Sequence, residues 1–304
     1  MNIDGVLLLD KPSGITSNAA LQRVKRLLGA AKAGHVGTLD PLATGLLPIC
    51  LGEATKFSGQ MLAADKAYAA DVQLGVTSDT GDAEGRITSR AEVHATRAEV
   101  EAALLPFRGA IQQVPPLYSA LKRDGRPLYA YARAGESVER EPRTVVIHAL
   151  SLVQFDSPLL RIEVRCGKGT YIRVLAEDIG SALGCGGMLS GLRRLAVGPY
   201  DLAAATPLDA LEALSLPQRR ALLAPVDSLL AGFSRVLLDA AASRLLTTGR
   251  PGECGGTADG IYRLYGPAER FLGLGEVVGG QLRARRLMAT AARAEDAAQA
   301  TKIS

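Results

Sequence analysis

The N-terminal part of the chain changes from an apolar run to helical spacing within a few residues. Residues 5–10 (GVLLLD) end at a turn of Lys, Pro, Ser and Gly, which is typical of a buried strand. Ser17 is suited to cap the helix that follows. The apolar positions of that helix lie on one face, at Ala20, Leu21, Val24, Leu27 and Leu28.

The middle of the chain predicts two strands and a helix. Apolar and polar residues alternate over residues 68–74 and again over residues 160–166, which is the period of a half-buried strand. Residues 172–183 carry apolar side chains at helical spacing, and Gly184 follows as a plausible end. These three segments are expected to form the core of the fold.

Other segments carry local signals. Thr96 and Glu99 form a capping-box pattern in front of a helix. Residues 192–197 are compatible with a further strand. The acidic, glycine-rich residues 77–85 are expected to form a solvent-exposed hairpin loop.

The composition changes after about residue 200. A segment rich in Ala and Leu is expected to be helical as far as about residue 232. Beyond it, a small region has the pattern of a helix at residues 240–248, a glycine-rich turn, and short strands at residues 261–265 and 271–278.

Strands and helices interleave without the regular spacing of βαβ units. We therefore expect an α+β fold with a mixed, largely antiparallel sheet and a small β-rich C-terminal domain. The expected boundaries are residues 1–232 for the first domain, 233–288 for the second, and 289–304 for a flexible tail.

Composition and charge narrow the class of protein only a little. The chain carries 35 Lys and Arg against 31 Asp and Glu, a net charge of +4 that permits a phosphate-rich partner without requiring one. No apolar stretch is long enough to span a membrane, no signal segment is recognisable, and the four cysteines lack metal-ligand spacing. We expect a cytoplasmic protein with reduced thiols, no metal and no cofactor.

Residues 34–48 (GHVGTLDPLATGLLP) are dense in glycine and proline. Both residue types shape the backbone tightly, so this loop would present the Asp40 carboxylate and the His35 imidazole at fixed positions. A structural turn, with Asp40 as the turn-former before Pro41, explains the same residues at least as well on physical grounds alone.

This loop resembles the signature G-H-x-G-x-L-D-P-x-A-x-G of the TruB family of pseudouridine synthases. Further family motifs are matched in order between about residues 5 and 200. They are LDKPSGITS at 9–17, the strand that opens with KAY at 66–68 and its loop TSDTGD at 77–82, QVPPLYSALK at 113–122, GKGTYIR at 167–173 and LRRL at 192–195. One such match is weak, but six in sequence are specific.

The resemblance implies an isomerase that converts uridine 55 in the T loop of tRNA to pseudouridine. The base leaves C1′ through N1 and rejoins it through C5, which requires no redox partner. The lack of nucleotide-binding and metal-binding motifs fits such a reaction. The target base must flip out of its stack, and aromatic rings can recover part of that cost.

The resemblance assigns the catalytic carboxylate to Asp40, with attack at C1′, attack at C6 and removal of a ribose proton all left open. It places Tyr68 on the everted base and Arg173 beside the carboxylate, where a guanidinium keeps the carboxylate ionised and oriented. Each residue also has an ordinary structural interpretation, as a core side chain or a solvated charge. The remaining residues implied around the nucleotide are His35, Tyr171 and Leu192.

Four basic residues are candidate RNA backbone contacts, and solvated charges are an equally good explanation of each: Lys11, Lys56, Arg123 and Arg126. By resemblance, residues 233–288 form an RNA-binding domain of the PUA or PUA-like kind that contacts the acceptor end of tRNA. The expected partner is tRNA, without a membrane or an obligate protein partner.

Two other functions remain as hypotheses. The first is a tRNA chaperone that refolds the T arm and would keep that activity after Asp40→Asn. The second is an enzyme that uses an Asp nucleophile on a small nucleotide or sugar, whose binding would depend little on salt. A related synthase of H/ACA particles shares much of the loop, but the length and tail of this chain favour a stand-alone enzyme.

Overall fold

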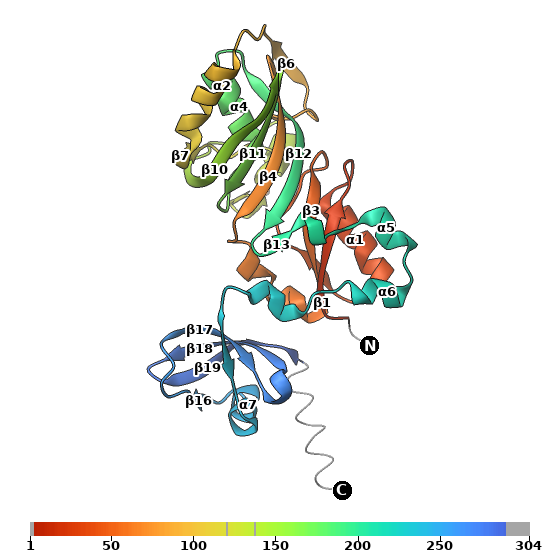
Figure 1. Cartoon of the computed structure of the whole chain (residues 1–304), viewed down its shortest axis with the longest axis vertical. Coiled ribbons are helices and arrows are strands. Elements are labelled where there is room, and N and C mark those ends of the chain that lie inside the picture. The colour runs from red at the N-terminus through yellow and green to blue at the C-terminus, as the bar shows by residue number, and fades with distance from the viewer. Residues whose placement is uncertain (1–2, 120, 137, 290–304) are drawn as a thin grey trace.

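Most of the chain is built around one ten-stranded sheet, which occupies the two upper lobes of the molecule (Figure 1). The computed structural model describes residues 3–119, 121–136 and 138–289. Two short strands pair at the side of the sheet, β2 (Ala33–His35) with β3 and β13 (Tyr200–Asp201) with β12. The others lie in the order β14 (Thr206–Pro207), β1 (Gly5–Lys11), β3 (Thr44–Leu51), β12 (Gly187–Val197), β4 (Lys66–Leu74), β11 (Leu159–Cys166), β10 (Arg143–Asp156) and β7 (Gly109–Gln113).

The pairing in this sheet is mainly antiparallel, as the sequence predicts. Among the described strands of this sheet, β1 with β14 and β12 with β3 are the parallel pairs. The strands predicted from alternation are confirmed as β4 and β11, which lie side by side with Tyr68 opposite Val164. The prediction for residues 192–197 is also confirmed, although β12 begins earlier, at Gly187.

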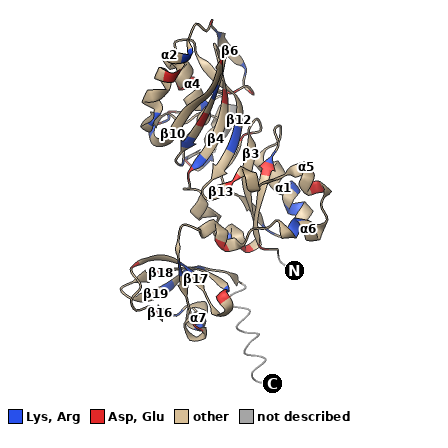
Figure 2. Cartoon of the chain, viewed as in Figure 1, with Lys and Arg blue, Asp and Glu red and all other residues tan. Residues whose placement is uncertain are grey.

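Helices bury separate apolar cores on the sheet. The first core lies between β1, β3, α1 (Ser17–Leu28) and α5 (Leu208–Ala213). The second lies between β4, β10, β11, α2 (Arg97–Leu104) and α4 (Ile172–Ala182). The predicted capping box of α2 is confirmed. Figure 2 places Lys and Arg on both lobes, including α1 and β12, rather than on a single patch.

Two local predictions are wrong. The N-cap of α1 is Thr16, whose side chain accepts a hydrogen bond from the Ala19 amide at 3.0 Å, so Ser17 is the first helical residue. The segment expected to be helical up to residue 232 is broken, because Ser215 and a following proline start a new helix. It contains α5, α6 (Leu216–Ala221) and a 3-10 turn, η5 (Val226–Leu230).

Short elements connect the larger ones. A hairpin of β5 (Val76–Ser78) and β6 (Ile87–Arg90) follows β4. The 3-10 turns η1 (Gly52–Lys56) and η2 (Ser58–Met61) follow β3, and η3 (Leu105–Phe107) follows α2. The remaining short elements are β8 (Lys122–Arg123), β9 (Arg126–Pro127), α3 (Leu128–Arg133), and the 3-10 turns η4 (Leu202–Ala204) and η6 (Pro267–Glu269).

A second, five-stranded sheet forms the lower lobe in Figure 1. The strands expected at residues 261–265 and 271–278 are confirmed as β17 (Gly260–Tyr265) and β18 (Phe271–Val278), and the expected helix is α7 (Ala240–Thr247). The others are β15 (Ser234–Leu237), β16 (Gly252–Glu253) and β19 (Gln281–Leu287), which the sequence pattern did not predict. The predicted tail lies outside the described residues from position 290 onward.

The two sheets meet through the turns that follow β3. The Phe57 ring packs edge-on against Phe271, with centroids 5.7 Å apart. Tyr265 donates a hydrogen bond to the Asp227 carboxylate at 2.6 Å. Lys56 Nζ donates to the Leu287 carbonyl at 3.3 Å. The interface therefore contains both apolar and polar contacts.

Candidate active site

The loop that carries Asp40 lies between β2 and β3, and the first residue of α1 binds it through two hydrogen bonds. The buried Ser17 hydroxyl donates to the Leu39 carbonyl at 2.9 Å and accepts from the Leu39 amide at 2.8 Å. The Gly14 amide donates to the Pro41 carbonyl at 2.9 Å. Since both neighbours of Asp40 in the chain are fixed, its carboxylate has a defined position.

Asp40 pairs with an arginine while part of its side chain stays open to solvent. Arg173 Nη2 lies 3.2 Å from Asp40 Oδ2, and the Asp40 side chain is 44 % exposed. Burial of the carboxylate raises the pKa of Asp40 above its ordinary value, Arg173 opposes that rise, and the charge of Asp82 adds to it. The carboxylate is thus oriented by a cation and is more basic than a free Asp.

Four groups bind the Arg173 guanidinium at the start of α4. Its side chain is 8 % exposed, and its Nε lies 3.4 Å from Asp82 Oδ2. Nη1 donates to the Thr80 carbonyl at 3.0 Å and Nη2 to the Tyr118 carbonyl at 2.9 Å. The interpretation of Arg173 as a solvated helix-start charge is therefore wrong.

Asp82 corrects the expectation that residues 77–85 form a solvated loop. Its side chain is 5 % exposed, and it accepts hydrogen bonds from the Thr80 hydroxyl at 2.7 Å and the Glu84 amide at 3.1 Å. The hairpin folds back on β12, where the Ala83 amide donates to the Leu189 carbonyl at 2.9 Å. The acidic pattern looked solvent-exposed because its partner, Arg173, is distant in sequence.

Tyr171 precedes α4, and a buried glutamine holds its backbone. Gln113 is 2 % exposed. Its side chain accepts from the Tyr171 amide at 3.0 Å and donates to the Tyr171 carbonyl at 3.2 Å. Burial raises the pKa of the Tyr171 phenol, and the charge of Asp40 adds to that rise. Tyr171 is two residues before Arg173, which contacts the Asp40 carboxylate.

Tyr68 and Leu192 lie on neighbouring strands in the centre of the sheet. Both pack against the two apolar cores that the helices cover. Burial raises the pKa of Tyr68, Arg194 lowers it, and Asp40 raises it further. The structure therefore gathers Asp40, Arg173 and both tyrosines in one region, with Leu192 two positions from Arg194 on β12.

His35 ends β2 opposite Ile49 of β3. Its Nδ1 is buried and has no hydrogen-bond partner among the described residues. Burial lowers the pKa of His35, and the nearby Arg194 lowers it further. The imidazole is thus a neutral group in a confined position.

The side chains of the four candidate RNA contacts differ in their exposure to solvent. Lys11 is fully buried, and its ammonium donates to the carbonyls of Pro12 at 2.8 Å and Ile15 at 2.7 Å. Burial lowers the pKa of Lys11 to about 8. These bonds use the ammonium inside the fold, which opposes the expected phosphate contact.

The other three candidates form contacts within the protein. Lys56 pairs with Glu53 at 2.7 Å at the junction of the two sheets. Arg126 makes two hydrogen bonds to Glu136, at 2.9 and 3.1 Å, and Arg123 donates to the Glu139 carbonyl. Both arginines keep more than two-fifths of their side chains exposed, so an RNA contact by them stays a prediction.

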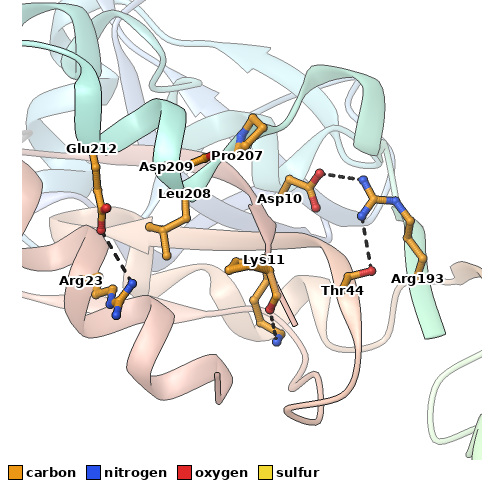
Figure 3. A pocket seen from close by; sticks show the side chains of 10 residues that line it. Asp10, Lys11, Arg23, Thr44, Arg193, Pro207, Leu208, Asp209 and Glu212 are labelled. Carbon is orange, nitrogen blue, oxygen red and sulfur yellow. Dashed lines mark hydrogen bonds and ion pairs between the residues drawn. The ribbon is translucent and has the colours of Figure 1, made fainter. Parts of the chain in front are cut away.

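A cavity of about 340 Å³ lies beside the Asp40 loop, between β1, β12 and α5 (Figure 3). Arg193 bridges Asp10 at 2.6 Å and Thr44 at 3.3 Å across it. Asp40 and the two tyrosines do not line this cavity, so it is separate from the site described above. Within the described residues, no three His, Cys, Asp or Glu side chains gather as a metal site requires, and no helix is long and apolar enough to cross a bilayer.

Three residues of this site are not among the candidates predicted from the sequence: Asp82, Gln113 and Arg194. Each lies inside a segment that carries the family resemblance. The signal that could have identified them is a polar side chain within an otherwise apolar or turn-forming motif. Arg194, for instance, stands in a strand and is 1 % exposed.

We expect Gly45→Ala to destabilise the protein by about 1–3 kcal/mol, as overpacking does. Gly45 has φ +98°, and a Cβ there would lie 2.3 Å from the Arg194 carbonyl oxygen, a backbone atom that cannot move aside. Gly14→Ala is the matched control, because Gly14 has φ +81° and a Cβ on it would meet nothing within 4 Å. Urea unfolding of both variants measures the difference, and equal destabilisation would contradict the steric argument.

Comparison with solved structures gives the fold. The chain is similar to a chain in the crystal structure of a Cbf5–Nop10–Gar1 complex, with a TM-score of 0.70 and 24 % identity, over 93 % of this chain and 84 % of that one. It is also similar to a chain of an H/ACA RNP bound to a substrate RNA containing 2′-deoxyuridine, with a TM-score of 0.69 and 22 % identity, over 93 % of this chain and 84 % of that one. The predicted mixed α+β fold with a β-rich C-terminal domain is confirmed.

Family profiles place the chain among the pseudouridine synthases. Residues 25–172 match the TruB family pseudouridylate synthase (N terminal domain). Residues 173–231 match the tRNA pseudouridylate synthase B C-terminal domain, and residues 234–288 match pseudouridine synthase II TruB, C-terminal.

Close relatives agree with these profiles. The chain is 57 % identical over 296 residues to tRNA pseudouridine synthase B of Aromatoleum aromaticum, covering 96 % of this chain and 95 % of that protein. It is 56 % identical over 288 residues to the protein of the same name from Azoarcus, covering 95 % and 96 %. The chain belongs to the TruB family of pseudouridine synthases.

Proposed function

We propose that this chain isomerises uridine 55 in the T loop of tRNA to pseudouridine, with Asp40 as the reacting carboxylate. The observation that carries the proposal is the surroundings of Asp40. Its carboxylate lies 3.2 Å from a buried arginine, and its side chain is still partly exposed to solvent. A purely structural ion pair has no need of that open face. Relatives more than half identical to this chain bear the name of a tRNA pseudouridine synthase.

The environment of Asp40 suits the chemistry of a glycosidic rearrangement. The N1–C1′ bond of uridine breaks, the base turns, C5 bonds to C1′, the proton on C5 leaves to water, and N1 takes up a proton. A carboxylate can act in this sequence as a nucleophile or as a base, and in either role it reacts in its ionised form. Arg173 favours that form, while burial and Asp82 make the carboxylate more basic, so Asp40 is both oriented and reactive.

The surroundings of Asp40 suit an everted uracil. Flipping the base costs a few kcal/mol, and stacking on an aromatic ring returns about 1–3 kcal/mol. Tyr68 and Tyr171 are the rings within electrostatic reach of Asp40, and Leu192 lies on the strand beside Tyr68. These residues form the uracil pocket in our proposal, with His35 as a neutral group that fills space beside it.

The RNA partner in this proposal is tRNA, recognised by two units, residues 1–232 and residues 233–288. Arg283 and Arg286 are exposed on β19 and are suited to phosphate groups of the acceptor end. Arg123 and Arg126 are suited to the T arm. The proposal includes a cytoplasmic location and needs no obligate protein partner.

The test uses a tRNA transcript that carries tritium at C5 of its uridines. Because the C5 hydrogen is lost when C5 joins C1′, purified protein is expected to release one equivalent of tritium per tRNA. A transcript with cytidine at position 55 is the matched control and is expected to release none. No release from the uridine transcript, or equal release from both, would overturn the proposal.

A further inference from the structure

Arg194 is a buried cation in the centre of the site, and the reaction proposed above leaves it without a role. The residue is 1 % exposed. It lies on β12 between two strands, opposite Tyr68 of β4 and opposite Gly45 of β3. Its position therefore connects the strand that carries the stacking ring to the strand that follows the Asp40 loop.

The guanidinium of Arg194 bonds both arms of the Asp40 loop. Its Nη2 donates to the Gly37 carbonyl at 3.1 Å, before Asp40, and its Nε donates to the Leu46 carbonyl at 2.7 Å, after Asp40. Space for the side chain depends on a glycine, because a Cβ on Gly37 would lie 3.2 Å from Nη1. The Arg194 guanidinium thus holds the two arms of the loop together.

Arg194 also lies directly opposite Tyr68 where β12 pairs with β4. Burial lowers the pKa of Arg194, and Tyr68 is the neighbour that opposes that fall. No carboxylate in the described part of the chain forms an ion pair with Arg194. Burying a cation without a counterion costs several kcal/mol, and a neutral donor could satisfy the carbonyls. A charged side chain at this position therefore points to a role beyond satisfying those carbonyls.

We propose that Arg194 is a positioning residue, which fixes the Asp40 loop relative to β4, the strand that carries Tyr68, for the isomerisation. Arg194 cannot touch the RNA because it is buried, so its loss acts on the reaction step and leaves RNA binding intact. The inference rests on the proposed function, since it assigns Arg194 to the same reaction.

The experiment compares Arg194→Gln and Arg194→Lys with the wild type in single-turnover tritium release and in tRNA binding. A displacement of reacting groups by about 1 Å costs on the order of 100-fold in rate, which is the loss expected for Arg194→Gln. Arg194→Lys keeps the charge but cannot bond both arms, so about a tenfold loss is expected. The tRNA affinity of both variants is expected to stay within about threefold of wild type.

Arg219→Gln is the matched control. The Arg219 guanidinium also donates to three backbone carbonyls, those of Leu211, Leu27 and Glu212, each at 2.9 Å, and it lies on α6. Its loss is expected to lower the melting temperature without changing the single-turnover rate. A rate for Arg194→Gln within threefold of wild type, or an equal loss of rate and affinity, would overturn the inference.

Two further arms separate this inference from the proposed function. If Arg194→Gln does not fold, a rate for Arg194→Lys within threefold of wild type overturns the inference. If the wild type releases no tritium, or Asp40→Asn releases as much as wild type, the proposed function fails instead.

Discussion

Asp40→Asn is expected to abolish pseudouridine formation while the affinity for tRNA stays within a few-fold of wild type. The amide is similar in size and can still occupy the fixed loop, but it offers neither a nucleophile nor a base. Loss of a reacting group costs several orders of magnitude in rate, of the order of 10⁴–10⁶ by analogy with other catalytic nucleophiles. Single-turnover tritium release measures the rate, and filter binding measures the affinity.

Two results for Asp40→Asn would contradict the assignment. Product at a rate near wild type would mean that another group reacts. A parallel loss of tRNA binding would mean that Asp40 holds the RNA or the loop rather than reacting. Asp65→Asn is a useful control, because Asp65 pairs with His148 at 3.2 Å and with Arg165 at 3.7 Å, outside the site.

The pH dependence of the reaction follows from the environment of Asp40. Burial raises the pKa of this carboxyl above its ordinary value of 3.8, and in the proposed reaction the carboxylate acts in its ionised form. Activity is therefore expected above the raised pKa and is expected to be lost as the pH falls through it. In Asp82→Asn the acid limb of the single-turnover profile is expected to move to lower pH, because a like charge that raises the pKa of Asp40 is gone.

Arg173→Gln is the second variant with a large expected effect, because it removes a cation shared by two carboxylates. Asp40 loses its partner at 3.2 Å, and Asp82, with a side chain only 5 % exposed, is left buried and unpaired. Breaking a buried pair from one side costs about 3–5 kcal/mol of stability. We expect a lower free energy of unfolding and a rate at least 100-fold below wild type.

The double variant Arg173→Gln with Asp82→Asn separates these two effects. It removes the unpaired charge of Asp82, so the free energy of unfolding is expected to recover in part. The rate is expected to stay low, because Asp40 still lacks its cation. Urea unfolding and single-turnover release report the two quantities. Recovery of the rate together with stability would show that Arg173 serves the fold alone.

Much of this architecture is predictable from local patterns. The alternation of apolar and polar residues predicted β4 and β11. Helical spacing of apolar residues with a terminal glycine predicted α4, and the Thr96–Glu99 capping box predicted α2. These signals lie within one element, where side-chain period and backbone geometry determine each other. The family motifs located Asp40, Tyr68, Tyr171 and Arg173 in a region that the structure brings together.

The errors concern contacts between residues distant in sequence. Ser17 looked like a cap, but Leu39 provides a better partner for its hydroxyl. Lys11 looked like a surface charge, but the carbonyls of its own turn enclose its ammonium. Asp82 was expected to be solvated, but Arg173 of α4 forms an ion pair with it in the folded protein. Polar residues satisfied inside the fold resemble exposed ones in the sequence, because the partner is not adjacent.

The eight residues of β3 set the spacing between the Asp40 loop and the C-terminal sheet. The strand begins at Thr44, directly after the Asp40 loop, and ends at Leu51, directly before the turns that contact the C-terminal sheet. At about 3.3 Å per residue it spans roughly 26 Å. Because its hydrogen bonds to β1 hold the strand extended, that spacing is fixed within the protein. Under the proposed function, an RNA bound by both units would have to present its reacting loop and its helix end at a matching distance.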